Sequence, residues 1–192
     1  GLAFLATQQN DDGSFGNKYF VGMTGLTLLA FLGHCETPES IRYGDLVIGA
    51  TMYLMERSMK NNGLISINDE GAHVAYEHAI ATYALCEFYS MTKESGRKVP
   101  QLESVINKAV GIILKEQTDL GGWPYYGAQK DDMSVSGWNI QALKAAHTTG
   151  LSMIGLNRAM NAAVNHYLPG IQDEVGAFKY HVNDVNGRET LT

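Results

Sequence analysis

Hydrophobic residues recur with two different helical patterns along the chain. In one segment they fall on a single side of a helix, at Leu102, Val105, Ile106, Ala109, Val110 and Ile113. This spacing is typical of an amphipathic helix with one face in water. We expect similar helices from about Leu156 to Leu168 and from Pro38, with Thr37 as the N-cap of the second. These amphipathic helices predict an outer layer.

Three other segments are apolar on nearly every side. They cover residues 23–32, 79–89 and 136–146. A helix that is apolar on every side is expected to be buried on every side, so these segments predict an inner layer. They align without gaps on the pairs Thr24-Gly25, His78-Ala79 and Ser136-Gly137.

A Gly-x-apolar turn recurs four times between these helices. The four turns are Gly13-Ser14-Phe15, Gly63-Leu64-Ile65, Gly121-Gly122-Trp123 and Gly176-Ala177-Phe178, and their first glycines are 50, 58 and 55 residues apart. A period of this length with two helices indicates a repeat of helical hairpins. We therefore predict an all-α fold with a single repeat domain of about three and a half hairpins over residues 1–192, in units of about 1–36, 37–98, 99–150 and 151–192. Both ends look cut, which predicts a fragment of a longer protein.

Composition narrows the possible partners. The formal net charge is −6, and no run of Lys or Arg is longer than two, which argues against a nucleic-acid surface. No apolar run approaches the roughly 20 residues that a membrane span needs, and no targeting segment is recognisable. The two cysteines, Cys35 and Cys86, are too few for a disulfide scaffold. Nothing in the sequence assigns a compartment.

Two kinds of segment carry a resemblance to a known family. Residues 8–15 (QQNDDGSF) and 116–123 (EQTDLGGW) resemble the Gln…Gly-x-Trp/Phe repeat of squalene cyclases and protein prenyltransferases. Residues 76–82 and 132–138 resemble bacterial prenyltransferase or squalene-cyclase repeat proteins. The resemblance implies an α/α toroid, which in that family is usually built from six helical hairpins. With fewer hairpins here, we expect an incomplete ring.

The family's catalytic motifs are only partly present. Squalene cyclases protonate an alkene with a DxDD motif, whereas residues 129–132 read Gln-Lys-Asp-Asp and retain only Asp131 and Asp132. These two are the candidate catalytic residues, and the alternative is that they cap the following helix. Prenyltransferases hold zinc with a DxC pair and a distant His. Ser134 occupies the place of the Cys and His78 lies near that of the His, and serine is a poor zinc ligand. We expect no metal and no cofactor.

The densest set of metal-ligand side chains is His73, Glu77 and His78. The favoured interpretation is a loop His, a surface Glu and a His that lines the inner-helix cavity. The aromatic turn residues Phe15, Trp123 and Phe178 are assigned to packing. The predicted ligand-binding residues are His78, Tyr76, Tyr125, Tyr126 and Trp138.

The leading hypothesis is a squalene-cyclase/prenyltransferase-like repeat domain without an intact catalytic motif. It would bind an apolar small molecule or a protein segment on its inner face. The alternative is a squalene-type terpenoid cyclase or a prenyltransferase-related enzyme that uses Asp131 and Asp132. A further alternative is a carbohydrate-active α/α-ring enzyme, which needs two carboxylates roughly 5–10 Å apart. We also expect self-association through exposed terminal hairpins.

Overall fold

The fold is helical, as predicted. The computed structural model describes residues 1–66, 73–125, 128, 130–182 and 190–191. The helices are α1 (Leu2–Ala6), α2 (Phe20–Gly33), α3 (Gly44–Lys60), α4 (Val74–Glu94), α5 (Leu102–Glu116), α6 (Met133–Thr149), α7 (Leu156–Ala162), the π-helix η2 (Ala163–Tyr167) and α8 (Leu168–Ile171). Two short strands, β1 (Phe178–Lys179) and β2 (Thr190–Leu191), pair in antiparallel orientation.

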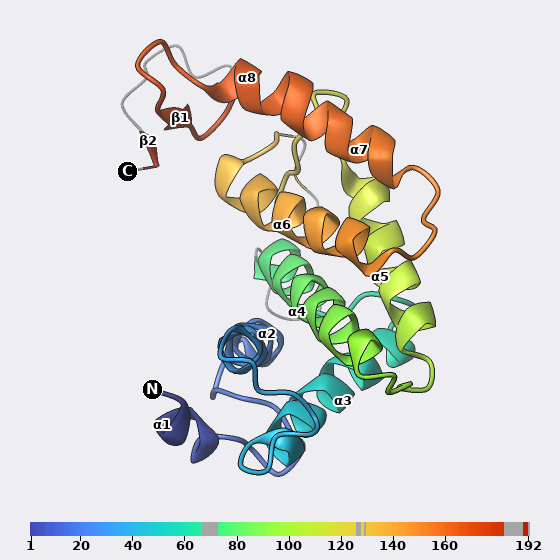
Figure 1. Cartoon of the computed structure of the whole chain (residues 1–192). Coiled ribbons are helices and arrows are strands. Elements are labelled where there is room, and N and C mark those ends of the chain that lie inside the picture. Colours follow the sequence, from blue (N-terminus) through green and yellow to red (C-terminus); the bar gives the residue numbers. More distant parts are fainter. Residues whose placement is uncertain (67–72, 126–127, 129, 183–189, 192) are drawn as a thin grey trace.

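The helices are arranged in two layers. In Figure 1, α2, α4 and α6 lie side by side in a row, and α4 in the middle packs against both of its neighbours. The helices α3, α5 and α7 form a second layer along one side of this row. There α3 contacts α2 and α4, and α5 contacts α4 and α6. The chain therefore alternates between an outer and an inner helix.

The outer helix α5 follows its sequence pattern closely. All six apolar positions predicted for its buried face are buried, from Leu102 to Ile113. The inner helix α6 is not buried on every side as predicted, because Gln141 and Lys144 are exposed. Contrary to the prediction, α2 is not buried on every side, because Met23 and Leu26 are 43% and 40% exposed. The reason is its position at the end of the row, where α4 covers only one of its sides.

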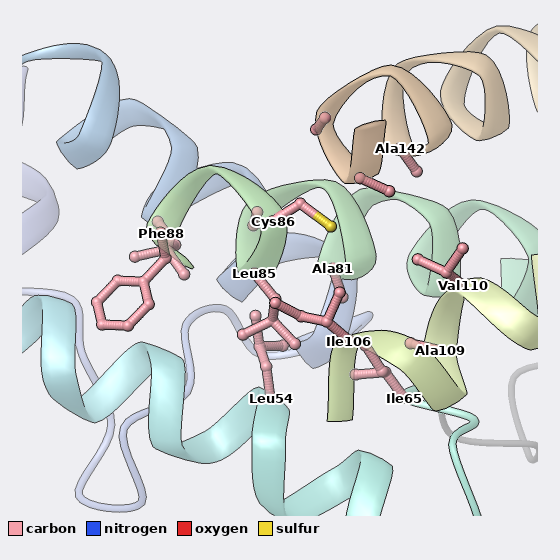
Figure 2. Packing of buried hydrophobic residues seen from close by; sticks show 14 of the residues in the cluster. Leu54, Ile65, Ala81, Leu85, Cys86, Phe88, Ile106, Ala109, Val110 and Ala142 are labelled. Carbon is pink, nitrogen blue, oxygen red and sulfur yellow. The ribbon is translucent and has the colours of Figure 1, made fainter. Parts of the chain in front are cut away.

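The hydrophobic core lies between the two layers. Figure 2 shows Leu85 of α4 close to Leu54 of α3 and Ile106 of α5, with Phe88 farther along α4. Burying side chains of this size contributes about 1.5–3 kcal/mol each. Cys86 is a free thiol inside the same core, where burial raises its pKa, so it acts as a small hydrophobic residue.

The two predicted boundaries of outer helices need correction. The helix expected from Pro38 begins at Gly44, because residues 37–40 close a turn in which the Ser40 backbone N–H donates to the Thr37 carbonyl at 2.9 Å. The helix expected from Leu156 to Leu168 is present, but its middle is the π-helix η2. A π-helix is rare and accommodates one more residue per hydrogen-bonded turn than an α-helix.

The glycine turns depend on the conformational freedom of glycine. Gly13, Gly63, Gly121 and Gly176 all have positive φ angles, between +87° and +106°, a region that favours glycine. Two of these glycines also allow close packing. A Cβ atom on Gly13 would lie 2.4 Å from the Gly49 carbonyl oxygen. A Cβ atom on Gly121 would lie 2.6 Å from the Ala162 carbonyl oxygen. Each of these turns therefore packs directly on an outer helix.

A glutamine four residues before the glycine strengthens three of the four turns. Gln117 donates through Nε2 to the Gly121 carbonyl and to the Ala159 carbonyl of α7, both at 2.9 Å. Gln9 likewise donates through Nε2 to the Gly13 carbonyl of its own turn and to the Leu46 carbonyl of α3. Gln172 donates to the carbonyl of Gly176 at 3.1 Å. The Gln…Gly spacing in the sequence therefore corresponds to a side chain that closes the turn and, at Gln9 and Gln117, also joins it to an outer helix.

Candidate functional site

The start of each inner helix is fixed by the same kind of hydrogen bond. A side chain in the first turns of the helix accepts a bond from the backbone N–H of the last residue of the Gly-x-apolar turn. These bonds run from Phe15 to Thr24, from Ile65 to His78 and from Trp123 to Ser136, at 2.9, 3.2 and 2.8 Å. The three acceptors are the residues that the gap-free alignment places together. Their common role is to position the turn against the inner helix.

His78 uses both ring nitrogens in such structural bonds. Its Nδ1 accepts from the Ile65 N–H, so the proton is on Nε2, which donates to the Ala109 carbonyl of α5 at 3.0 Å. Burial lowers the pKa of His78 from 6.5 to about 4. The imidazole is therefore neutral at pH 7 and links α4 to the Gly63 turn and to α5. Neither nitrogen is left for a ligand.

Glu77 does not lie on the surface, as the sequence had suggested. It is 3% exposed, and its carboxylate accepts hydrogen bonds from the Gly22 N–H at 3.0 Å and from the Ser66 hydroxyl at 2.8 Å. Gly22 is in the first turn of α2, whose free N–H groups favour a negative charge. Glu77 therefore caps the neighbouring inner helix.

The three side chains His73, Glu77 and His78 do not converge. His73 is exposed, and its ring packs at a tilt against the ring of Tyr19 with the centroids 4.5 Å apart. Among the described residues, no three His, Cys, Asp or Glu side chains form a group that could hold a metal ion.

Asp132 is the N-cap of α6. Its carboxylate accepts from the Ser134 and Val135 N–H groups at 2.9 and 3.2 Å, and also from the Ser134 hydroxyl. The Tyr76 hydroxyl bonds to Ser134 Oγ and lies 3.0 Å from the Tyr125 hydroxyl. Burial raises the pKa of Tyr76. Three predicted site residues are thus joined through Ser134 in one tyrosine network, Tyr125–Tyr76–Ser134–Asp132.

Asp131 occupies a separate buried position. It is 5% exposed, and its Oδ2 finds no hydrogen-bond partner among the described residues. The buried hydroxyl of Tyr167, from η2, is likewise without a partner in that part of the chain. A Cβ atom on Gly122 would lie 2.8 Å from Asp131 Oδ2 and 2.7 Å from Tyr167 Cζ, so the carboxyl and the tyrosine ring both pack against Gly122. Burial raises the pKa of Asp131 and favours its neutral form.

The last two predicted residues are outside these groups. Trp138 is half-buried on α6, and Tyr126 lies outside the described residues. Sequence reasoning missed Tyr167, because an amphipathic pattern does not reveal a π-helix. It also missed Ser136, whose aligned position was noted without a role.

Two apolar cavities lie near these residues. One, between α4, α5 and α6 beside His78, Trp123 and Tyr125, has a volume of about 30 Å³. It is enough for one or two water molecules and far below the roughly 300–1,000 Å³ of a drug-sized pocket. The other, between α6 and α7–η2, has a volume of about 130 Å³.

Comparison with known proteins leaves the function open. No protein-family model matches the sequence, and no curated protein matches it significantly. None of the helices within the described ranges is long and apolar enough to cross a membrane.

Proposed function

We propose that the chain is a squalene-cyclase/prenyltransferase-like repeat domain, an arc of an α/α toroid, that binds an apolar ligand or a protein segment and carries out no catalysis of its own. The alternation of inner and outer helices, with a glycine turn before each inner helix, supports the toroid arrangement. The motif resemblance is the second support.

The observation that carries the non-catalytic function is the use of the Asp132 carboxylate. A cyclase acid has to present a proton to a substrate in an apolar cavity, whereas this carboxylate accepts bonds from two N–H groups and one hydroxyl at the start of α6. An N-cap of this kind stabilises a helix by about 1 kcal/mol. His78 is engaged by backbone on both ring nitrogens in a similar way.

The surface that favours binding is the apolar groove between α6 and α7–η2, which we call the α6–α7 groove. It is lined by Ile140, Leu143, Lys144, Met160, Ala163 and Val164. All of these side chains except Lys144 are apolar, and Val164 is 51% exposed. Exposed apolar surface of this kind marks binding sites in folded proteins.

Two assays test this proposal. The purified chain is expected to leave squalene and an isoprenyl diphosphate unchanged, and turnover that Asp131→Asn abolishes would contradict the proposal. In the second assay, anilinonaphthalene sulfonate should bind the groove and fluoresce. Val164→Asp should weaken dye binding, whereas Val175→Asp, at an 88% exposed position outside the groove, is the matched control. Equal binding by both variants would count against the groove.

The second candidate function is a cyclase or related enzyme with Asp131 as the acid. The specific observation in its favour is a buried carboxyl oxygen without a partner, in surroundings that raise the pKa of Asp131. Burial of this type is how enzymes keep a carboxylic acid protonated near neutral pH. The turnover assay with Asp131→Asn decides between the two functions.

A further inference from the structure

The α6–α7 groove has two counterparts within the chain. In each repeat, an inner helix and the outer helix that follows it form two walls, and the next inner helix packs against both. Helix α4 contacts both α2 and α3, and α6 contacts both α4 and α5. In Figure 1 the same two walls recur at α6 and α7. The described residues contain a helix that covers the first two grooves and none that covers the third.

A pair of equivalent glycines shows what fills such a groove. On α2, a Cβ atom at Gly25 would lie 2.9 Å from Ile80 Cγ2 and 3.2 Å from the Ala81 Cα, so the backbone of α4 rests on this glycine. Gly137 is the equivalent residue of α6, since it follows Ser136 as Gly25 follows Thr24. No heavy atom lies within 4 Å of a Cβ placed on Gly137. The contact surface for a backbone is present on α6 and is open.

The packing of the inner helices also indicates the direction in which a helix bound in the groove would run. Gly22 bonds to Glu77, and Gly25 meets Ile80, so the pairing of α2 with α4 advances in the same direction on both helices. The inner helices are therefore parallel. Lys144 lies seven residues after Gly137, on the same face of α6, and lines the groove. Seven residues after Ile80 stands Glu87.

We propose that the α6–α7 groove binds a single α-helix from outside residues 1–192, parallel to α6, with a small apolar face over Gly137 and an acidic residue two turns later, opposite Lys144. The proposal rests on the proposed function, because it specifies the protein segment that the domain binds. The sequence of α4 has this pattern: Ile80 and Ala81 provide the small apolar face that would lie over Gly137. Glu87 provides the acidic residue that would lie opposite Lys144.

The test uses a labelled peptide with the sequence of residues 74–94 and Cys86→Ser, titrated with the 192-residue chain and followed by fluorescence anisotropy. We expect saturable binding. Gly137→Leu should weaken it about tenfold or more, because the new side chain occupies the contact surface. Gly111→Leu is the matched control, since Gly111 on α5 also has no heavy atom within 4 Å of its Cβ position. Both variants should fold, as circular dichroism can verify.

A charge exchange tests the orientation of the helix. Lys144→Glu should weaken binding of the peptide, and the peptide change Glu87→Lys should restore it for that variant only. The absence of saturable binding to the folded chain would overturn the proposal, as would equal losses in the Gly137 and Gly111 variants. A dimer that Gly137→Leu dissociates would place a second copy in the groove and would also overturn it. Dye binding at the groove without peptide binding would agree with the proposed function and would contradict only the proposal that the ligand is a helix.

Discussion

The Nδ1 atom of His78 accepts a hydrogen bond from the backbone N–H of Ile65. In the other two turns the corresponding acceptor is a hydroxyl oxygen, from Thr24 and from Ser136. One structural role is thus filled by two chemistries, and only the imidazole can gain a proton at mildly acidic pH. This makes the second hairpin the acid-sensitive part of the inner layer.

Acid should destabilise the protein through His78. Its pKa is lowered from 6.5 to about 4 on folding. Above pH 6.5 both the folded and the unfolded chain hold it neutral. As the pH falls from 6.5 towards 4, only the unfolded chain takes up the proton, and the free energy of unfolding should decrease by about 3 kcal/mol. Urea unfolding at several pH values measures this decrease. Because carboxylates titrate in the same range, the difference between wild type and His78→Gln isolates the histidine, and parallel curves would reject its role.

Alanine should have opposite effects at the two equivalent glycines of the inner layer. Gly25→Ala should lower stability by about 1–3 kcal/mol, because the new methyl group would press on Ile80 and the backbone of Ala81. Gly137→Ala should raise stability by about 0.5–1 kcal/mol, because the site is open and alanine favours the helix. Thermal unfolding of the two variants gives the signs directly, and the same sign for both would contradict the assigned packing.

The glutamines of the turns should differ in importance. Gln117→Ala removes bonds to two backbone carbonyls, one of them on α7, and should cost about 1–3 kcal/mol. Gln172→Ala removes a bond to Gly176 in an exposed turn, and its cost should stay below about 1 kcal/mol. Chemical denaturation of both variants makes the comparison. A larger loss for Gln172→Ala would show that the link to the outer helix adds little.

Asp131→Asn should stabilise the chain at neutral pH. Because burial raises the pKa of Asp131 on folding, the wild type loses stability as the pH rises through that value, and the amide does not titrate. The gain should shrink as the pH falls below the ordinary aspartate range of about 4. Unfolding free energies at acidic and neutral pH test this, with Asp132→Asn, which retains a capping oxygen, as the control. A gain independent of pH would point to a cause other than ionisation.

The exposed face of α2 should make the chain self-associate. Met23 and Leu26 are both more than a third exposed, and apolar surface of this size favours association. Light scattering should show a mass that rises with concentration, and Leu26→Lys should reduce the rise. Ile41→Lys is the control, because Ile41 is fully exposed in a turn outside helix α2. A stable monomer at high concentration would contradict this expectation.

Local patterns in the sequence predicted the helices well. The period of apolar residues located α5 and its buried face, and the glycines located the turns, because both signals depend on contacts within one hairpin. The exposure of Met23 could not be predicted, since it depends on the end position of α2 in the row. The contacts of the candidate site could be predicted from the sequence even less well than the helices. Gly22, which donates to Glu77, and Tyr167, which packs with Asp131 against Gly122, come from other hairpins, and no spacing rule connects them.

The π-helix η2 makes the position of Tyr167 depend on chain length as well as on chemistry. Each residue advances an α-helix by about 100°, so the additional residue in the π-turn determines the direction in which Tyr167 points. If residues 163–167 formed regular α-helical turns with the same number of residues, Tyr167 would lie about 100° further round the helix axis. The tyrosine ring would then turn away from Gly122, against which the Asp131 carboxyl also packs, although neither residue had been replaced.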